Sequence, residues 1–191
     1  MKTKPFFQLK TPQEVEAIIA EFAPVETESV SLLEALGRVA CEDITSPEDL
    51  PEFHRSTMDG CAVFSADTFG ASESAPVYLQ VQGEVAMGEE ASVALEEGKA
   101  IKISTGGMLP EGSDAVVPVE YTKELSDGTL EVTRSVAPWA SVVQIGEDFQ
   151  QGELVLRRGT RLRAQEVGAL AGLGITQVRV YRRPRVALIT T

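Results

Sequence analysis

The chain has 191 residues, 43% of them hydrophobic, and its 29 acidic and 17 basic residues give a formal net charge of −12. This acidity disfavours nucleic acid as a partner, because binding to phosphates needs clustered Lys and Arg. No run of about 20 apolar residues and no apolar leader is present, so we expect a cytoplasmic protein without a membrane span. The two cysteines and the single histidine lack metal-type spacing and do not predict a zinc site.

The first quarter of the chain predicts two capped helices. Thr11-Pro12-Gln13-Glu14 combines a cap, a proline in the first turn and a capping-box acid. Four apolar residues follow at helical spacing: Val15, Ile18, Ile19 and Phe22. Ser31-Leu-Leu-Glu34 is a second capping box, and Gly37 is a stop signal for that helix. Residues 39–44 then predict a strand.

The middle of the chain has the composition of a β-rich module, with short β-prone runs separated by Gly, Pro and Asp. Strands are predicted at residues 77–81, 100–104 and 115–119. Residues 123–132 predict a hairpin in which Asp127-Gly128 supplies a primed turn.

The helical pattern returns after Gly152. A helix is predicted over residues 164–173, with Gly174 as its stop signal, and a strand over residues 177–181. The apolar run at residues 186–189 predicts a further strand that is buried on both faces, as in a parallel sheet.

These patterns predict an α+β fold in which a β-rich domain is inserted into a discontinuous α/β linker domain. We place the N-terminal and linker domain at residues 1–46 plus 151–184 and the inserted domain at residues 47–150. Residues 185–191 are expected to form the first strand of a truncated further domain.

Two short motifs could carry chemistry, although each also has a purely structural explanation. Asp59-Gly60 could be an ordinary turn, or it could present a carboxylate to a metal ion or a polarised water. Ser56 beside it could donate a hydrogen bond or only cap the turn. Thr105-Gly106 could be a sharp strand end, or it could let an oxyanion approach the backbone closely.

Three further residues have a structural explanation beside a functional one. Asp148, in Gly146-Glu147-Asp148, could be a site residue or part of a solvated loop. His54 could act as a general base, but no nucleophile partner is recognisable, so a structural or surface role is expected. Trp139, the single tryptophan, is expected to pack under a loop.

Several blocks, in one order, resemble the MoeA/gephyrin family of molybdenum-inserting enzymes. The blocks are Ser-x-Met-Asp-Gly-x-Ala-Val at 56–63, Ile-x-Thr-Gly-x-x-Leu-Pro-x-Gly-x-Asp-Ala-Val-Val at 103–117, Gly146-Glu-Asp148, Gly168 to Gly174 and Arg185-Val-Ala-Leu-Ile. The resemblance implies an elongated, MoeA-like N-terminal region that lacks the molybdopterin-binding domain.

The resemblance also implies an activity. Family members convert adenylylated molybdopterin and molybdate to molybdenum cofactor and release AMP in a step that needs Mg²⁺ or another divalent ion. Matched motif by motif, Asp59, Thr105 and Asp148 fall on catalytic positions, with Asp59 also a metal ligand. Ser56, Gly60 and Gly106 fall on substrate-binding positions. The family further implies a homodimer and molybdopterin adenylyltransferase as a partner.

Three departures from the family pattern leave a second hypothesis open. The family usually has Tyr at Cys61, Asp-Asn or similar at His54-Arg55, and basic residues where Val143-Gln144-Ile145 stands. Less positive charge there would weaken attraction for an anionic ligand. The chain is therefore either one wall of an enzyme's active-site cleft, inactive alone, or a naturally short, non-catalytic scaffold or binding module.

Overall fold

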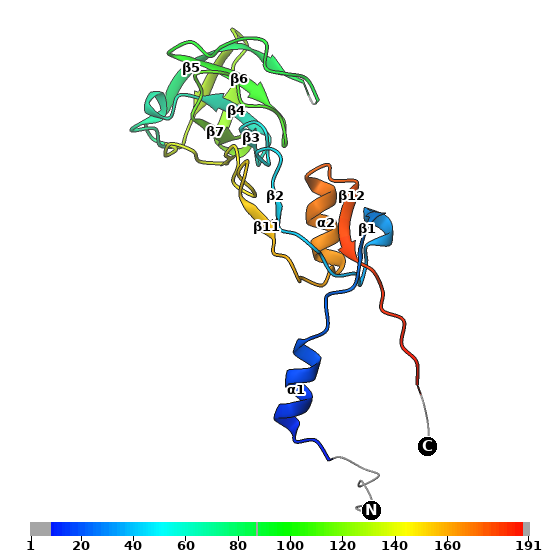
Figure 1. Cartoon of the computed structure of the whole chain (residues 1–191). Coiled ribbons are helices and arrows are strands. Elements are labelled where there is room, and N and C mark those ends of the chain that lie inside the picture. The colour runs from blue at the N-terminus through cyan, green and yellow to red at the C-terminus, as the bar shows by residue number, and fades with distance from the viewer. Residues whose placement is uncertain (1–8, 87, 189–191) are drawn as a thin grey trace, which may run out of the picture. The chain divides into compact units, whose positions relative to one another are not determined.

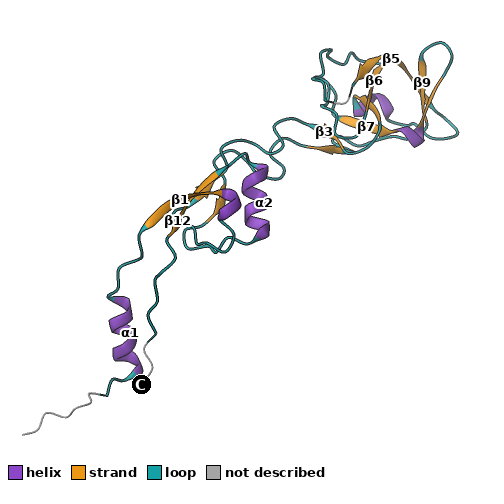
Figure 2. Ribbon diagram, turned by 90° about the vertical axis from the view of Figure 1, so that its right-hand side faces the viewer, coloured by secondary structure: helices purple, strands orange, loops and turns teal. Residues whose placement is uncertain are grey.

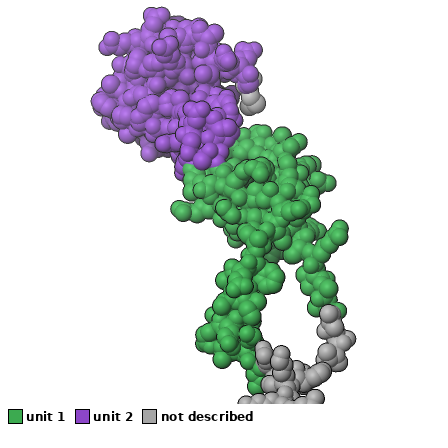
Figure 3. All heavy atoms as spheres, viewed as in Figure 1, with its two compact units in different colours: residues 1–44, 154–191 green, residues 45–153 purple. Residues whose placement is uncertain are grey.

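The computed structural model describes residues 9–86 and 88–188, which contain both helices and β sheets (Figures 1 and 2). This composition confirms the predicted α+β class in its broad sense. The described chain divides into two compact units (Figure 3). Unit 1 comprises residues 1–44 and 154–191, and unit 2 comprises residues 45–153.

Unit 1 is built on a pair of antiparallel strands, β1 (Thr27–Ser31) and β12 (Gln177–Tyr181). Alternate residues of β12 point inward, as the period of a strand requires, so that Val178 and Val180 are buried. Their inner face forms one core with side chains of the segments around α2 (Ala164–Gly172). The buried members are Leu32, Ala35, Leu156, Leu162, Leu170, Val178 and Val180.

Helix α1 (Pro12–Ala20) begins as its sequence predicts. The Thr11 hydroxyl accepts a hydrogen bond from the Glu14 N–H at 3.3 Å, and the Glu14 carboxylate accepts one from the Thr11 N–H at 2.8 Å. This reciprocal pairing satisfies two N–H groups that the first turn leaves free. No residue of α1 is buried, and the predicted apolar stripe is exposed, with Phe22 just beyond the helix 75% exposed.

Helix α2 is fixed at its N-terminus by Glu166. Its carboxylate accepts hydrogen bonds from the Arg163 N–H at 2.8 Å and from the Arg163 guanidinium at 2.5 Å. The Arg163 contact is the main reason why the pKa of Glu166 falls to about 2. The helix stops before Gly174, as predicted, where the backbone turns with φ +68°.

Unit 2 contains a six-stranded sheet in the order β7-β4-β6-β5-β9-β8. Its strands are β4 (Gly60–Val63), β5 (Val77–Val85), β6 (Lys99–Ile103), β7 (Ala115–Pro118), β8 (Thr122–Glu124) and β9 (Thr129–Val132). Neighbours are antiparallel except β5 and β6, which are parallel. Ala62 and Val63 of β4 and Val116 and Val117 of the edge strand β7 are fully buried.

Shorter elements complete the fold. Strand β3 (Arg55–Ser56) pairs antiparallel with β10 (Val142–Val143), and β2 (Ile44–Thr45) pairs with β11 (Leu154–Leu156). The 3-10 helices are η1 (Leu32–Glu34), η2 (Ser65–Thr68) and η3 (Val119–Tyr121).

Four local predictions need correction. Ser31 does not cap a helix, because it belongs to β1 and pairs with Gln177, and only the single turn η1 follows it. Residues 39–44 do not form one strand; Val39 and Ala40 make isolated bridges and β2 starts at Ile44. The hairpin forms, but Asp127 is not at positive φ and Gly128 alone is, at +82°, so the turn is not a type I′ turn.

The fourth correction concerns the end of the chain. Residues 185–188 form no strand, and Val186 and Leu188 are 76% and 91% exposed rather than buried. Residues 189–191 lie outside the described residues.

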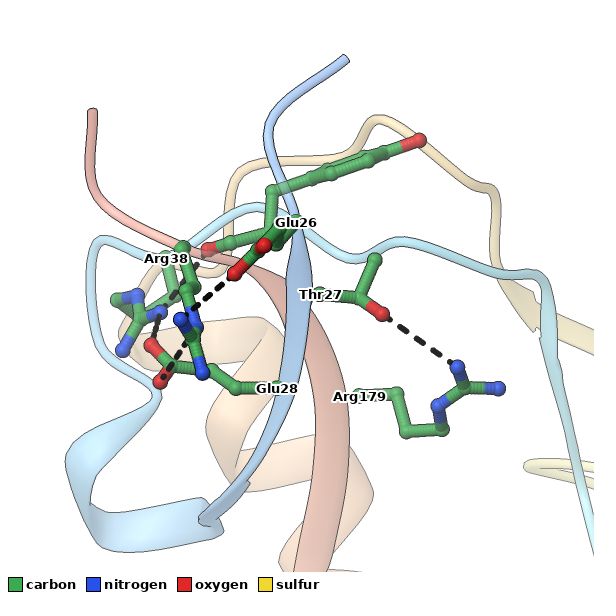
Figure 4. Close-up of polar contacts among 7 residues, drawn as sticks. Glu26, Thr27, Glu28, Arg38 and Arg179 are labelled. Atoms are coloured by element: carbon green, nitrogen blue, oxygen red, sulfur yellow. Dashed lines mark hydrogen bonds and ion pairs between the residues drawn. The ribbon is translucent and has the colours of Figure 1, made fainter.

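A chain of charged residues lies along the β1–β12 pair (Figure 4). Arg38, which is 9% exposed, donates to the Glu28 carboxylate and, at 2.9 Å, to the Tyr181 carbonyl. Arg182 pairs with Glu26 at 2.7 Å and with Glu28 at 3.6 Å. These contacts neutralise a buried guanidinium, which would otherwise carry a large desolvation cost.

Candidate functional site

Two loops of unit 2 meet at Asp59 and Thr105. Asp59 precedes β4 and Thr105 follows β6, and these two strands are neighbours in the sheet. One Asp59 carboxylate oxygen, Oδ1, accepts hydrogen bonds from the Thr105 N–H at 2.7 Å and from the Thr105 hydroxyl at 3.0 Å. These two bonds, the backbone bond first, lower the pKa of Asp59. The exposed carboxylate is therefore ionised and fixed in direction.

The backbone around Ser56 ties the same two loops together. The Gly106 N–H donates to the Ser56 carbonyl at 2.8 Å, and the Ser56 N–H donates to the Gly107 carbonyl at 3.0 Å. The Ser56 hydroxyl donates to the Met58 carbonyl within its own loop, and its side chain is buried. These bonds make Ser56 a residue that stabilises the loop. Gly106 is exposed, with φ +80°, and no atom lies within 4 Å of where its Cβ would be, so a ligand can approach its backbone.

Gly60 has a structural reason to be glycine. A Cβ atom there would lie 2.0 Å from the carbonyl oxygen of Val117 and 3.0 Å from the Cα of Pro118. The register of β4 and β7 pairs Gly60 with Pro118, so the two backbones approach too closely for any side chain. The close pairing at Gly60 therefore fixes the first residue of β4, which directly follows Asp59.

A surface hollow of about 340 Å³ lies beside Asp59 and Gly60. Its wall includes Lys102, whose ammonium group binds the Glu124 carboxylate at 2.6 Å. Cys61 also lines it, and burial raises the pKa of this thiol to about 11. Cys61 is therefore a packed, protonated thiol, not a nucleophile. Local sequence patterns did not indicate Lys102, because its partner Glu124 lies 22 positions away, in β8.

A second hollow, of about 370 Å³, borders the Gly106 side of the same turn. It is acidic, with Glu52, Glu89 and Glu90 in its wall. Gly106 therefore lies beside carboxylates, which would disfavour an anion in this hollow unless a cation came with it.

Asp148 lies on another loop of unit 2, and among the described residues no hydrogen bond joins it to Asp59. Its N–H donates to the Leu50 carbonyl at 2.9 Å, and the preceding Gly146 N–H donates to the Pro51 carbonyl at 3.0 Å. The Asp148 side chain is exposed. The structure thus brings together Ser56, Asp59, Gly60, Thr105 and Gly106, and it places Asp148 on a loop that runs along residues 50–54.

The His54 ring makes two structural contacts that local sequence patterns did not indicate. Its ring nitrogen Nδ1 accepts a hydrogen bond from the Ile145 N–H at 3.1 Å, and its ring lies 4.8 Å from that of Trp139. Trp139 is 39% exposed, so it packs on one side only. The signals in the sequence were weak, namely a single histidine and a single tryptophan 85 positions apart.

The side chains described do not form a metal site by themselves. No group of three or more His, Cys, Asp or Glu residues within residues 9–86 and 88–188 is arranged to hold a metal ion. Magnesium, however, often uses only one or two carboxylates together with waters and substrate phosphates. Asp59 could supply one such ligand through Oδ2, the oxygen that Thr105 does not occupy.

Comparison with known proteins identifies the class to which this fold and loop arrangement belong. Residues 10–174 match the family model described as MoeA N-terminal region (domain I and II). The chain is 33% identical over 183 residues to a molybdopterin molybdenumtransferase of Staphylococcus epidermidis, covering 96% of this chain and 43% of that protein. The corresponding protein of Haemophilus influenzae is 36% identical over 168 residues, covering 88% and 40%.

A solved structure of a MoeA protein is also similar to this chain in fold and sequence. The crystal structure of a molybdopterin biosynthesis MoeA protein from Pyrococcus horikoshii matches with a TM-score of 0.83 at 38% identity, over 93% of this chain and 45% of that chain. The chain therefore belongs to the MoeA family. It spans less than half the length of these relatives. Among the described helices, none has the length and apolar character needed to cross a membrane.

Proposed function

We propose that this chain is the N-terminal region of an enzyme that converts adenylylated molybdopterin and molybdate to molybdenum cofactor and AMP. The observation that carries the proposal is the Asp59–Thr105 pair, a fixed and ionised carboxylate at the edge of a hollow, in a chain of the MoeA family. Relatives that bear the name molybdopterin molybdenumtransferase support the reaction class.

In this proposal the described loops supply one wall of the active-site cleft. Asp59 contributes negative charge and one ligand for a divalent ion such as Mg²⁺, which would neutralise phosphate charge when bound. Thr105 holds Asp59 in place and offers its hydroxyl to ligand oxygens. Asp148 is a second acid on the neighbouring loop. The protein acts as a homodimer, and the 191-residue chain alone is expected to release no AMP.

The test is a chimera in which this chain replaces the matching region of the Haemophilus influenzae relative. Formation of molybdenum cofactor and release of AMP would be measured for the chimera and for its Asp59→Asn variant. Asn keeps an oxygen that can accept from Thr105 but removes the charge. We expect turnover to fall by roughly 100-fold, as for loss of a charge that acts at the reacting groups.

Asp127→Asn is the matched control. Asp127 is also exposed, and its pKa is also lowered by hydrogen bonds from a threonine, Thr129, but it lies in the β8–β9 hairpin. The control should retain full turnover. A folded chimera that is inactive with Asp59 present, or equally active without it, would contradict the proposal and favour a non-catalytic scaffold.

A further inference from the structure

His54 lies between the two loops that carry the proposed site residues. Its carbonyl accepts a hydrogen bond from the Leu109 N–H at 2.9 Å, four residues after Thr105. Its ring accepts one from the Ile145 N–H at 3.1 Å, three residues before Asp148. One residue therefore contacts both loops, through its backbone on one side and its side chain on the other.

The ring fills a gap in the backbone pairing. Strands β3 and β10 pair up to Val143 and Arg55, and backbone bonding resumes where the Gly146 N–H donates to the Pro51 carbonyl. Between these points the Ile145 N–H turns to the imidazole instead of to a carbonyl. A backbone N–H needs an acceptor, and among the described residues His54 Nδ1 is the one that it finds.

Trp139 restrains the ring. The two ring centroids are 4.8 Å apart with an interplanar angle of 43°. The backbone of Trp139 is itself held, because its N–H donates to the Asp114 carbonyl at 2.6 Å. The imidazole thus has an aromatic neighbour on a fixed backbone, and this contact limits the ring orientations that keep Nδ1 on Ile145.

We propose that His54 is a positioning residue, which holds the Asp148 loop in a fixed register against the Thr105–Gly106 turn. The proposal rests on the proposed function, in which Asp59, Thr105 and Asp148 act on one substrate. The property required of residue 54 is an acceptor at the position of Nδ1. Asn should replace His54, because its side-chain oxygen can occupy that position. Phe should not, although it keeps the contact with Trp139.

The first experiment measures amide hydrogen exchange by NMR in the 191-residue chain and in His54→Phe, His54→Ala and His54→Asn. The Phe and Ala variants should exchange the Ile145 amide roughly five- to tenfold faster, and Asn should restore the slower rate. The Leu109 amide is the internal control, because it bonds the backbone of residue 54 and should not change. Phe preserves the packing if Ala does not fold.

Unchanged exchange at Ile145 in the Phe variant would overturn the proposal, and so would equal acceleration at Ile145 and Leu109. The second experiment uses the chimera described above. His54→Phe should lower kcat by roughly tenfold, as a displaced acid would, and His54→Asn should restore it. Faster exchange at Ile145 with unchanged kcat would overturn the positioning role. Failure of the proposed function itself would appear separately, as full activity of Asp59→Asn.

Discussion

At the residue scale, Gly60 sets the most severe steric limit near the candidate site. The Cβ of an alanine would lie 2.0 Å from the Val117 carbonyl oxygen, a backbone atom of a fully buried residue that pairs with β4. We expect Gly60→Ala to lower the free energy of unfolding by about 3 kcal/mol, the upper range for overpacking. Urea unfolding followed by circular dichroism would measure it.

Gly83→Ala is the matched control for Gly60→Ala. Gly83 lies in β5 of the same sheet, a Cβ there meets nothing within 4 Å, and its φ is not positive. This variant should be neutral or slightly more stable, because alanine reduces the entropy of the unfolded chain. Equal effects of the two substitutions on the free energy of unfolding would mean that β4 and β7 can separate enough to admit a Cβ at residue 60.

At the scale of an element, the start of α2 depends on the charge of Glu166. The pKa of Glu166 is lowered from about 4.5 to about 2, mainly by the Arg163 side chain. An acid with a lowered pKa stabilises the fold above its unfolded pKa, and this contribution disappears as the pH falls toward the folded pKa. Glu166→Gln should therefore destabilise the chain at pH 7, and the difference should shrink between pH 4.5 and pH 2.

The measurement for Glu166 is the urea midpoint of the wild-type chain and the Gln variant at several pH values. Glu14→Gln is a useful comparison, since Glu14 makes the analogous contact with the Thr11 N–H at the start of α1, where no residue is buried. Its effect on global unfolding should be small at every pH. A Glu166 effect that did not depend on pH would show that the carboxylate charge is unimportant.

The elements that sequence patterns predicted best are those whose period and stop signals agree, as in α2 and β12. The patterns failed where long-range pairing outweighs a local signal. Ser31 reads as a helix cap, yet its pairing with Gln177, 146 positions away, makes it part of a strand. The run at 39–44 is β-prone, but Val39 and Ala40 make only isolated bridges, to Arg161 and Val180, and the strand β2 starts at Ile44.

The candidate site was predictable only in part for the same reason. The motifs indicated Asp59 and Thr105 separately, but the hydrogen bonds between them join residues 46 positions apart and depend on the pairing of β4 with β6. Nothing in the local sequence indicated that a histidine ring would accept the Ile145 N–H. Contacts of this kind depend on where whole strands lie, so local patterns do not contain them.

At the scale of the whole molecule, the exposed face of α1 bears on the proposed homodimer. Ile19 and Phe22 are 61% and 75% exposed, and a nine-residue helix is marginal in water without a packed face. We expect light scattering to give about twice the 20.5 kDa chain mass. The double variant Ile19→Ser, Phe22→Ser should reduce the mass to that of one chain.

Leu33→Ser is the control for the α1 variant, because Leu33 is 88% exposed in unit 1 but lies outside α1. It should leave the measured mass unchanged. A wild-type chain that is monomeric at tens of micromolar, or a double variant that still dimerises, would contradict a dimer formed through α1.

The two ends of unit 2 are hydrogen-bonded to each other. The Ser46 N–H donates to the Glu153 carbonyl at 2.8 Å, and the Gly152 N–H donates to the Ser46 carbonyl at 2.8 Å. The two ends of this unit therefore lie side by side. A segment with adjoining ends can be exchanged for another of the same spacing without rerouting the rest of the polypeptide. Residues 45–153 can therefore be replaced as one unit. The sequence of their loops, which include Asp59 and Thr105, can change without altering the core of unit 1.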